Sequence, residues 1–307
     1  MSEESRGESG LADQTASPGP RTDIGPAPVN DNSSPSARRT ASGRLPATGL
    51  PQTIGDPTAD RSADGHRSVV SFVRRSPRMN ESQRQALATH GNEYLLEVPH
   101  DGRSTSVRQG STIDWPRAFG RPAPLIAEIG SGVGDSLVAM AADRPGHNVI
   151  AFEVYLTAVA STIGKLSRAD VHNVRLLVAD GSEGLRELIE PGSLEELWTF
   201  FPDPWPKKRH HKRRLVQPGF AALVAERLAA GGLWRLATDW PDYAEQMREV
   251  LDAEPRLVNV HHDRPGGWAP RADRPVTRFE RRGLDAGRPV RDLVYRRVNA
   301  PEEPDHG

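Results

Sequence analysis

Short apolar segments alternate with amphipathic segments through most of the chain after residue 124. The apolar segments are rich in β-branched and aromatic residues, which favours buried strands, and the segments between them carry apolar residues at helical spacing. Strands are expected at residues 125–129, 147–153, 174–180, 196–201 and 233–239, and helices at 135–142, 156–167, 218–230 and 241–251. This alternation predicts an α/β fold with a mostly parallel, Rossmann-like sheet and helices on both faces.

The C-terminal part continues with two further apolar segments. Residues 257–260 and 290–296 are expected to close the sheet as a hairpin pair. The segment between them is rich in Gly, Pro and Arg and is predicted to be a long loop. Since long loops without a role are uncommon in compact domains, residues 277–283 within it are expected to be functional.

The N-terminal part has a different composition. Residues 1–65 contain no Phe, Trp or Tyr and are crowded with Pro, Ser, Gly, Asp and Arg. Such a segment cannot bury enough apolar surface to offset its chain entropy, so we predict a disordered tail, which is either dispensable or binds a partner. An extension over residues 66–100 and the main domain over residues 101–300 are expected to follow.

Two features stand out in the extension. Asn80 and Gln83 have the spacing of a loose capping box, which predicts a short helix through about Ala88. Arg74 and Arg75 precede it and form either a solvated face or, as the family resemblance given below implies, a contact with cofactor or substrate.

Composition and charge narrow the function classes. The 307 residues include no cysteine, which excludes disulfides, iron–sulfur clusters and thiolate zinc sites and suits a reducing cytoplasm. No apolar run is long enough to span a membrane, and the N-terminus does not have the pattern of a signal peptide. The formal net charge is −1, so any contact with nucleic acid must depend on local clusters of basic residues.

A glycine-rich turn follows the first predicted strand of the main domain. Gly130, Gly132 and Gly134 allow a tight turn and let the backbone approach a ligand closely. A dinucleotide fingerprint needs its third glycine where this chain has Asp135, and an acid at that helix start would repel a pyrophosphate. S-adenosylmethionine has no phosphate and carries a sulfonium, so the spacing favours an adenosylmethionine site.

Acidic residues recur where the predicted strands end. Glu128 lies in the first strand, and Glu153, Asp180 and Asp239 end later ones. Glu153 is placed to accept hydrogen bonds from both ribose hydroxyls of an adenosine, and Asp180 can reach the adenine edge. The alternative for Glu153 is a surface acid at a strand end, but chance does not readily place acids at the ends of several strands.

The stretch from Phe200 to Arg214 contains more candidate functional residues than any other stretch of similar length in the chain. Pro202 and Pro204 fix Asp203 at the carboxyl end of a strand, where open α/β sheets bind their ligands. Six Lys or Arg and two His follow Pro206 directly, which predicts phosphate contacts, and Trp205 offers a face on which a base can stack. The alternative is an ordinary proline-rich turn.

This stretch resembles the signature of the bacterial tRNA (guanine-N7)-methyltransferases, which reads Phe-Pro-Asp-Pro-Trp followed by Lys, Arg-His and a basic tail. The resemblance covers about residues 67–297 and includes several motifs in the same order, with departures at Pro206 and Arg288. It implies a class I methyltransferase fold whose mostly parallel sheet has a C-terminal antiparallel strand. It also implies S-adenosylmethionine as cofactor and the guanosine at position 46 of tRNA as substrate.

The resemblance assigns roles to residues that match the family's motifs. The catalytic residue is Asp203. The cofactor site comprises Glu128, Gly130, Gly132, Gly134, Glu153, Asp180 and Asp203. The substrate site comprises Lys207, Asp239, Thr277, Arg278, Phe279 and Glu280. The RNA-contacting run comprises Arg209, His210, His211, Lys212, Arg213 and Arg214.

The expected chemistry is methyl transfer without a general base. Guanine N7 has a free lone pair in the base plane, so no proton must be removed, and Asp203 can stabilise the positive charge that develops on the base. Asp239 or Glu280 can accept hydrogen bonds from guanine, and Trp205 or Phe279 can hold the base outside its stack.

Other possibilities are weaker or remain open. No metal is expected, because the adjacent His261 and His262 would point to opposite faces of a strand. A nicotinamide-dependent oxidoreductase and a non-catalytic RNA-binding protein remain alternatives. The oligomeric state, monomer or homodimer, stays open.

Overall fold

The computed structural model describes residues 78–102, 105–271 and 274–299, all within one compact unit that spans residues 48–307. The predicted tail over residues 1–65, together with Arg74 and Arg75, lies outside the described residues.

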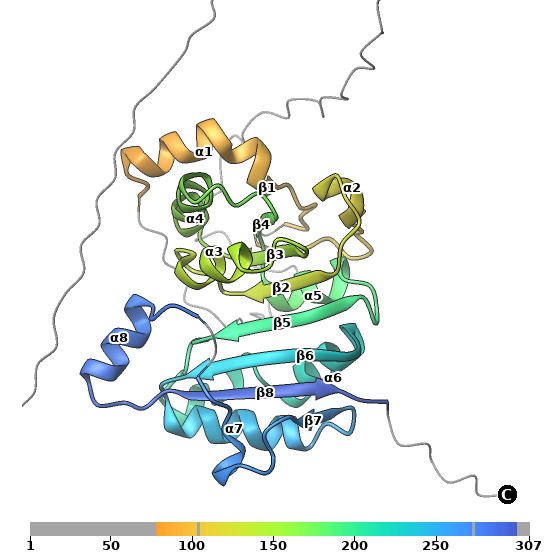
Figure 1. Cartoon of the computed structure of the whole chain (residues 1–307), viewed down its shortest axis with the longest axis vertical. Coiled ribbons are helices and arrows are strands. Elements are labelled where there is room, and N and C mark those ends of the chain that lie inside the picture. Colours follow the sequence, from red (N-terminus) through yellow and green to blue (C-terminus); the bar gives the residue numbers. More distant parts are fainter. Residues whose placement is uncertain (1–77, 103–104, 272–273, 300–307) are drawn as a thin grey trace, which may run out of the picture. The chain divides into compact units, whose positions relative to one another are not determined.

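An eight-stranded sheet forms the centre of the described unit (Figure 1). Its strands are β1 (Leu95–Leu96), β2 (Leu125–Ile129), β3 (Asn148–Glu153), β4 (Val174–Val178), β5 (Leu194–Phe200), β6 (Leu228–Thr238), β7 (Leu257–Asn259) and β8 (Arg291–Arg297). The spatial order is β1-β4-β3-β2-β5-β6-β8-β7. All pairs among β1 to β6 are parallel, and β8 is antiparallel to both β6 and β7, as predicted.

The strand order reverses between β2 and β5. From β2 the chain passes to β3 and β4 on one side, and from β5 it passes to β6 on the other. At such a switch point the connections leave in opposite directions and open a crevice at the carboxyl ends of the strands, where ligands of open α/β sheets bind. The glycine-rich turn follows β2, and Asp203 follows β5, so both predicted motifs lie at the carboxyl ends of the two strands that flank the switch point.

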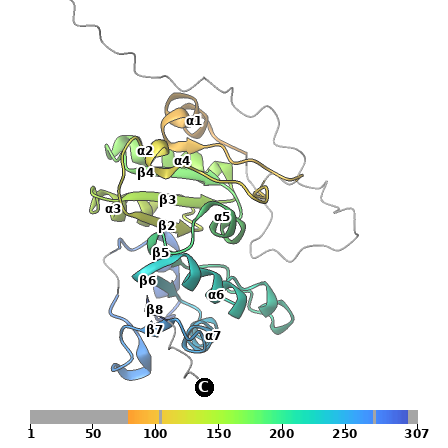
Figure 2. The ribbon, with the colours of Figure 1, turned by 90° about the vertical axis from the view of Figure 1, so that its right-hand side faces the viewer.

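Helices cover both faces of the sheet (Figure 2). One face packs against α1 (Glu81–Tyr94), α3 (Asp135–Ala142) and α4 (Leu156–Arg168), and the other against α5 (Gly181–Leu188), α6 (Pro218–Arg227) and α7 (Pro241–Asp252). Every residue of β2 and β3 is buried, as expected for strands covered on both sides. Trp198 and Trp234 lie on neighbouring strands but belong to the hydrophobic clusters of opposite faces.

Most predicted elements are confirmed, usually within one to three residues. Asn80 and Gln83 form the predicted capping box, and the helix they open runs to Tyr94, beyond the expected end at Ala88. The predicted loop at residues 277–283 is wrong, because Thr277 caps the helix α8 (Arg278–Asp285). The pattern also missed the short elements β1, α2 (Trp115–Phe119) and α5, and the 3₁₀ helix η1 (Lys208–Arg213).

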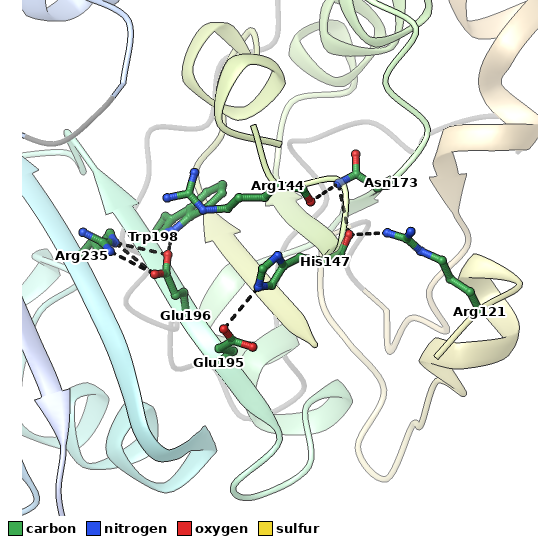
Figure 3. Close-up of polar contacts among 8 residues, drawn as sticks. All are labelled: Arg121, Arg144, His147, Asn173, Glu195, Glu196, Trp198 and Arg235. Carbon is green, nitrogen blue, oxygen red and sulfur yellow. Dashed lines mark hydrogen bonds and ion pairs between the residues drawn. The ribbon is translucent and has the colours of Figure 1, made fainter. Parts of the chain in front are cut away.

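Polar contacts hold the loops at the amino-terminal edge of the sheet (Figure 3). Asn173, directly before β4, donates to the backbone oxygens of Arg144 (2.9 Å) and His147 (3.1 Å). Arg121 also donates to the His147 oxygen (2.7 Å), and the His147 ring lies 3.2 Å from the Glu195 carboxylate. Since these contacts lie opposite the carboxyl ends, we assign them to stability of the fold.

Candidate active site

The glycine-rich turn after β2 leaves room for a ligand. Gly130, Gly132 and Gly134 have φ values of 78°, 55° and 77°, in the left-handed region that favours glycine. A Cβ atom built on Gly130 or Gly132 would meet nothing within 4 Å. On Gly134 it would lie 2.5 Å from the Thr162 side chain, so this third glycine allows α4 to pack closely.

The helix α4 holds the turn in place. Thr162 Oγ1 donates to the Gly132 carbonyl (3.3 Å), and Lys165 Nζ donates to the Val133 carbonyl (2.8 Å). Lys165 also pairs with the Asp135 carboxylate. This pairing reduces the repulsion that Asp135 was expected to exert on a pyrophosphate, so the glycine spacing is the stronger evidence against a dinucleotide. Sequence reasoning missed Thr162 and Lys165, although their three-residue spacing on one helix face was visible.

Glu153 connects the end of β3 to this turn. One carboxylate oxygen accepts from the Gly132 amide (2.8 Å), and the other accepts from the amides of Val154 (2.6 Å) and Tyr155 (2.9 Å). Burial raises the pKa of Glu153, these hydrogen bonds counteract the effect, and the charge of Asp203 raises it further. The carboxylate is thus fixed in orientation and interacts electrostatically with Asp203.

Glu128 lies beneath the same site. Its side chain is buried, and one carboxylate oxygen has no hydrogen-bond partner among the described residues. Burial, followed by the charge of Glu153, raises the pKa of Glu128 to about 8, so the acid is mostly protonated at neutral pH. The hydroxyls of Ser131 and Ser136, around the glycine-rich turn, are also buried without a partner in the described part of the chain. Unsatisfied buried polar atoms at a turn with open space indicate a site for a polar ligand.

Asp180 caps the helix that follows β4. Its carboxylate accepts from the amides of Ser182 (2.9 Å) and Glu183 (3.1 Å) at the start of α5. The next residue, Gly181, lies against Ile129, because a Cβ atom there would be 2.5 Å from that side chain. The structure therefore gives Asp180 a capping role, and its contact with adenine stays a prediction.

The turn that carries Asp203 has an unusual backbone. Phe201 (φ 52°) and Trp205 (φ 44°) both adopt the left-handed region, which is uncommon for residues other than glycine. They enclose Pro202, Asp203 and Pro204, and Asp203 is exposed. Backbone strain of this kind occurs often at functional sites.

The basic run begins directly after this turn and forms η1. Arg209 and Lys212 are exposed, whereas the Arg213 guanidinium lies 4.9 Å from the centre of the Trp205 ring. The His210 ring meets Trp205 edge-on at 5.8 Å, and desolvation together with nearby positive charges lowers the pKa of His210. These neighbouring cations therefore disfavour the charged form of His210.

Arg214 differs from the rest of the run because its side chain is buried. The guanidinium donates to the Pro204 carbonyl (2.8 Å), to Gln246 (2.6 Å) and to Asp242 (2.5 Å). These contacts tie the Asp203 turn to α7. We therefore leave Arg214 out of the RNA-contacting surface that the sequence predicted.

The residues expected to bind the guanine are already engaged in the structure. Asp239 accepts a hydrogen bond from Arg288 Nε (2.9 Å), and Thr277 Oγ1 accepts from the Glu280 amide (3.1 Å). Burial would raise the pKa of Glu280, but ion pairs with Arg271 and Arg274 hold it below its usual range.

The remaining predicted site residues have fewer described contacts. Lys207 and Arg278 are exposed, His211 lies 3.6 Å from the Asp242 carboxylate, and the Phe279 side chain lies outside the described part of the structure. In the described ranges, no group of three His, Cys, Asp or Glu side chains could hold a metal ion. The same ranges contain no helix that is long and apolar enough to cross a membrane.

The chain is similar to known proteins over most of its length. Residues 122–293 match a family described as putative methyltransferase. The chain is 53% identical over 281 residues to the tRNA (guanine-N(7)-)-methyltransferase of Cutibacterium acnes, covering 91% of this chain and 99% of the relative. Relatives of the same name from Nocardioides sp. (51% identity; 78% and 92% covered) and Alkalilimnicola ehrlichii (46%; 78% and 97%) also match.

Proposed function

Because the chain belongs to the tRNA (guanine-N(7)-)-methyltransferase family, we propose that it methylates N7 of the guanosine at position 46 of tRNA. One observation supports the proposal most strongly. An open glycine-rich turn, the acids Glu153 and Asp203 and the basic run all lie at the switch point of the sheet. An oxidoreductase would have no use for the basic run, and a passive RNA binder would have no use for the buried acids.

The residues around the glycine-rich turn fit S-adenosylmethionine, which supplies an activated methyl group. Open space above Gly130 and Gly132 admits the ligand, and the unpartnered oxygen of Glu128 offers it a hydrogen-bonding group. We propose that Glu153 accepts the ribose hydroxyls and that Asp180 contacts the adenine.

Asp203 is our candidate for the catalytic group. Its exposed carboxylate follows the carboxyl end of β5, next to the strand β2 that leads into the glycine-rich turn, so it lies at the same edge of the sheet as the proposed cofactor site. Guanine N7 attacks through its own lone pair, and the base becomes cationic as the methyl group arrives. A fixed negative charge stabilises that cation without a proton transfer.

The run on η1 is proposed to hold the tRNA. Arg209 and Lys212 are exposed only a few residues after Asp203, so phosphate contacts there would orient the RNA relative to the site. Trp205, fixed between Arg213 and His210, offers a nearby aromatic face. We place the enzyme in the cytoplasm, because tRNA is its substrate and the chain has no cysteine.

Labelled S-adenosylmethionine and a tRNA transcript test the proposal. We expect label at N7 of guanosine 46 and none in a matched transcript that carries adenosine at that position. Label at another guanine would refute the assignment of position 46 alone, and absence of label from all tRNA would refute the function.

A further inference from the structure

Arg274 is a buried cation that lies beside the Asp203 turn. Its side chain is 0% exposed, and Nη1 donates to both carboxylate oxygens of Glu280 (3.1 and 3.0 Å). Nη2 donates to the Asp292 carboxylate (3.0 Å) on β8. Since a buried charge requires partners, these contacts fix the guanidinium between α8 and the sheet.

The same guanidinium packs on the aromatic pair that leads into the turn. Its central carbon lies 5.2 Å from the ring centres of both Phe200 and Phe201, within the range of cation–π contacts. Phe200 ends β5, and Phe201 is the first of the two residues with left-handed backbone. Arg274 therefore contacts the residues that set the path of the chain into Asp203.

We propose that Arg274 is a positioning residue for methyl transfer. By holding Phe201 in its left-handed conformation, it keeps the Asp203 carboxylate at the carboxyl end of β5, beside the strand β2 that leads into the glycine-rich turn, and through Glu280 it connects the Asp203 turn to α8. The inference rests on the catalytic role proposed for Asp203.

An arginine suits this position better than a lysine. The guanidinium is planar, so its edge can donate to two carboxylates while its face lies on aromatic rings. A lysine at position 274 would keep one positive charge but would lose the paired donors and the flat contact with Phe200 and Phe201. Arg274→Lys thus separates charge balance from positioning.

Single-turnover methylation with both ligands saturating tests the proposal on folded protein. Arg274→Lys should slow the reaction roughly tenfold or more, because small displacements of reacting groups have large effects on rate. Adenosylmethionine affinity, measured by calorimetry, should change by less than about threefold. Arg271→Gln is the matched control: this 42% exposed residue pairs with the same Glu280, and its rate should stay within about threefold of wild type.

Phe201→Leu provides a second variant, since it removes one aromatic surface and leaves the ion pairs intact. The Phe201→Leu variant should also have a lower single-turnover rate. If Arg274→Lys does not fold, the rate of Phe201→Leu alone tests the proposal. Wild-type rates within about twofold in these variants would overturn the proposal and leave Arg274 a structural residue. Asp203→Asn, assayed in parallel, separates the role of Arg274 from the catalytic role of Asp203. If the single-turnover rate of Asp203→Asn is low and that of Arg274→Lys equals the wild-type rate, only the role of Arg274 is refuted. A normal Asp203→Asn refutes the catalytic role of Asp203 and the inference that rests on it.

Discussion

The position of Asp203 depends on two neighbours whose backbone is strained. Left-handed conformations at Phe201 and Trp205 cost of order 1–3 kcal/mol each and persist only when the surroundings enforce them. Two buried guanidinium groups supply that enforcement. Arg214 binds the Pro204 carbonyl on one side, and Arg274 packs on Phe201 on the other. The strain is therefore offset by the fold and fixes an exposed carboxylate in the crevice.

Asp203→Asn keeps the size of the side chain but removes its charge. Because we assign that charge to the cation that develops on guanine, turnover should fall on the order of a hundredfold or more, with much smaller losses in ligand binding. Single-turnover methylation and calorimetry measure the two effects separately. A rate within a few-fold of wild type would make Asp203 a structural turn residue.

Glu153→Ala removes the carboxylate that joins β3 to the glycine-rich turn. Adenosylmethionine binding should weaken by roughly 1.5–3 kcal/mol, because the ribose would lose its charged acceptor. The Gly132 amide would lose its partner as well, so a thermal melt must establish that the variant folds. Calorimetry that finds the wild-type affinity would exclude Glu153 from the cofactor site.

Among the helices and strands, the sequence predicts those whose apolar residues recur with a regular period. The strands β2 to β6 and the helices α3, α4, α6 and α7 follow from such patterns, and so does the edge at which their motifs meet. The helix α8 does not, because five of its eight residues are charged and it has too few apolar residues to show a helical period. It depends instead on the Thr277 cap and on the buried pair of Glu280 and Arg274, which are tertiary contacts.

The sequence also did not predict the 3₁₀ helix η1, because its residues too are held by tertiary contacts. A run of like charges predicts repulsion and solvation, and nothing in its composition distinguishes Arg214 from its neighbours. Only the fold shows that Arg214 points inward to Asp242 while Arg209 and Lys212 remain exposed. The sequence therefore located the basic run for which we propose RNA contacts, but it could not distinguish the buried Arg214 from the exposed residues of that run.

Replacing Arg209 and Lys212 together with Ala tests this division within the basic run. Each lost phosphate contact should reduce the slope of log affinity against log salt by about 0.7–0.9, and the melting temperature should barely change. Arg84 and Arg108, exposed residues in surface ion pairs, provide a matched double replacement that should leave the slope unchanged. Equal slopes for the η1 variant and wild type would show that η1 is only a solvated surface.

The net charge of the whole molecule is only −1, but its acidic and basic side chains are concentrated in different places. Acids from β2, β3 and the turn after β5 gather at the switch point, while cations occupy η1 beside them. Protonation of Glu128, whose pKa is raised to about 8, limits the negative charge at this point. The sequence placed these acids at one edge, but burial of Glu128 depends on packing that no motif records.

The raised pKa of Glu128 makes stability of the free protein depend on pH. The native state holds this proton up to about pH 8, while the unfolded chain releases it near the ordinary glutamate pKa of 4.5. An acid whose pKa is raised by folding contributes its full stability below the unfolded pKa, and that contribution is lost as pH rises towards the folded pKa. Wild-type stability should therefore fall between about pH 4.5 and 8 through this group.

Glu128→Gln imitates the protonated acid at every pH, so it should gain stability relative to wild type across this window, by a few kcal/mol at its upper end. Urea unfolding at a series of pH values measures the difference. Glu196→Gln is a control for which the opposite pH dependence is expected. Hydrogen bonds from Arg235 and Trp198 hold the pKa of Glu196 down despite its burial (Figure 3). Wild type should therefore be more stable than this variant at neutral pH, and the difference in stability should shrink as pH falls. If the difference between Glu128→Gln and wild type did not vary with pH, Glu128 would be ionised in the folded protein, and the site would carry one more negative charge than we propose.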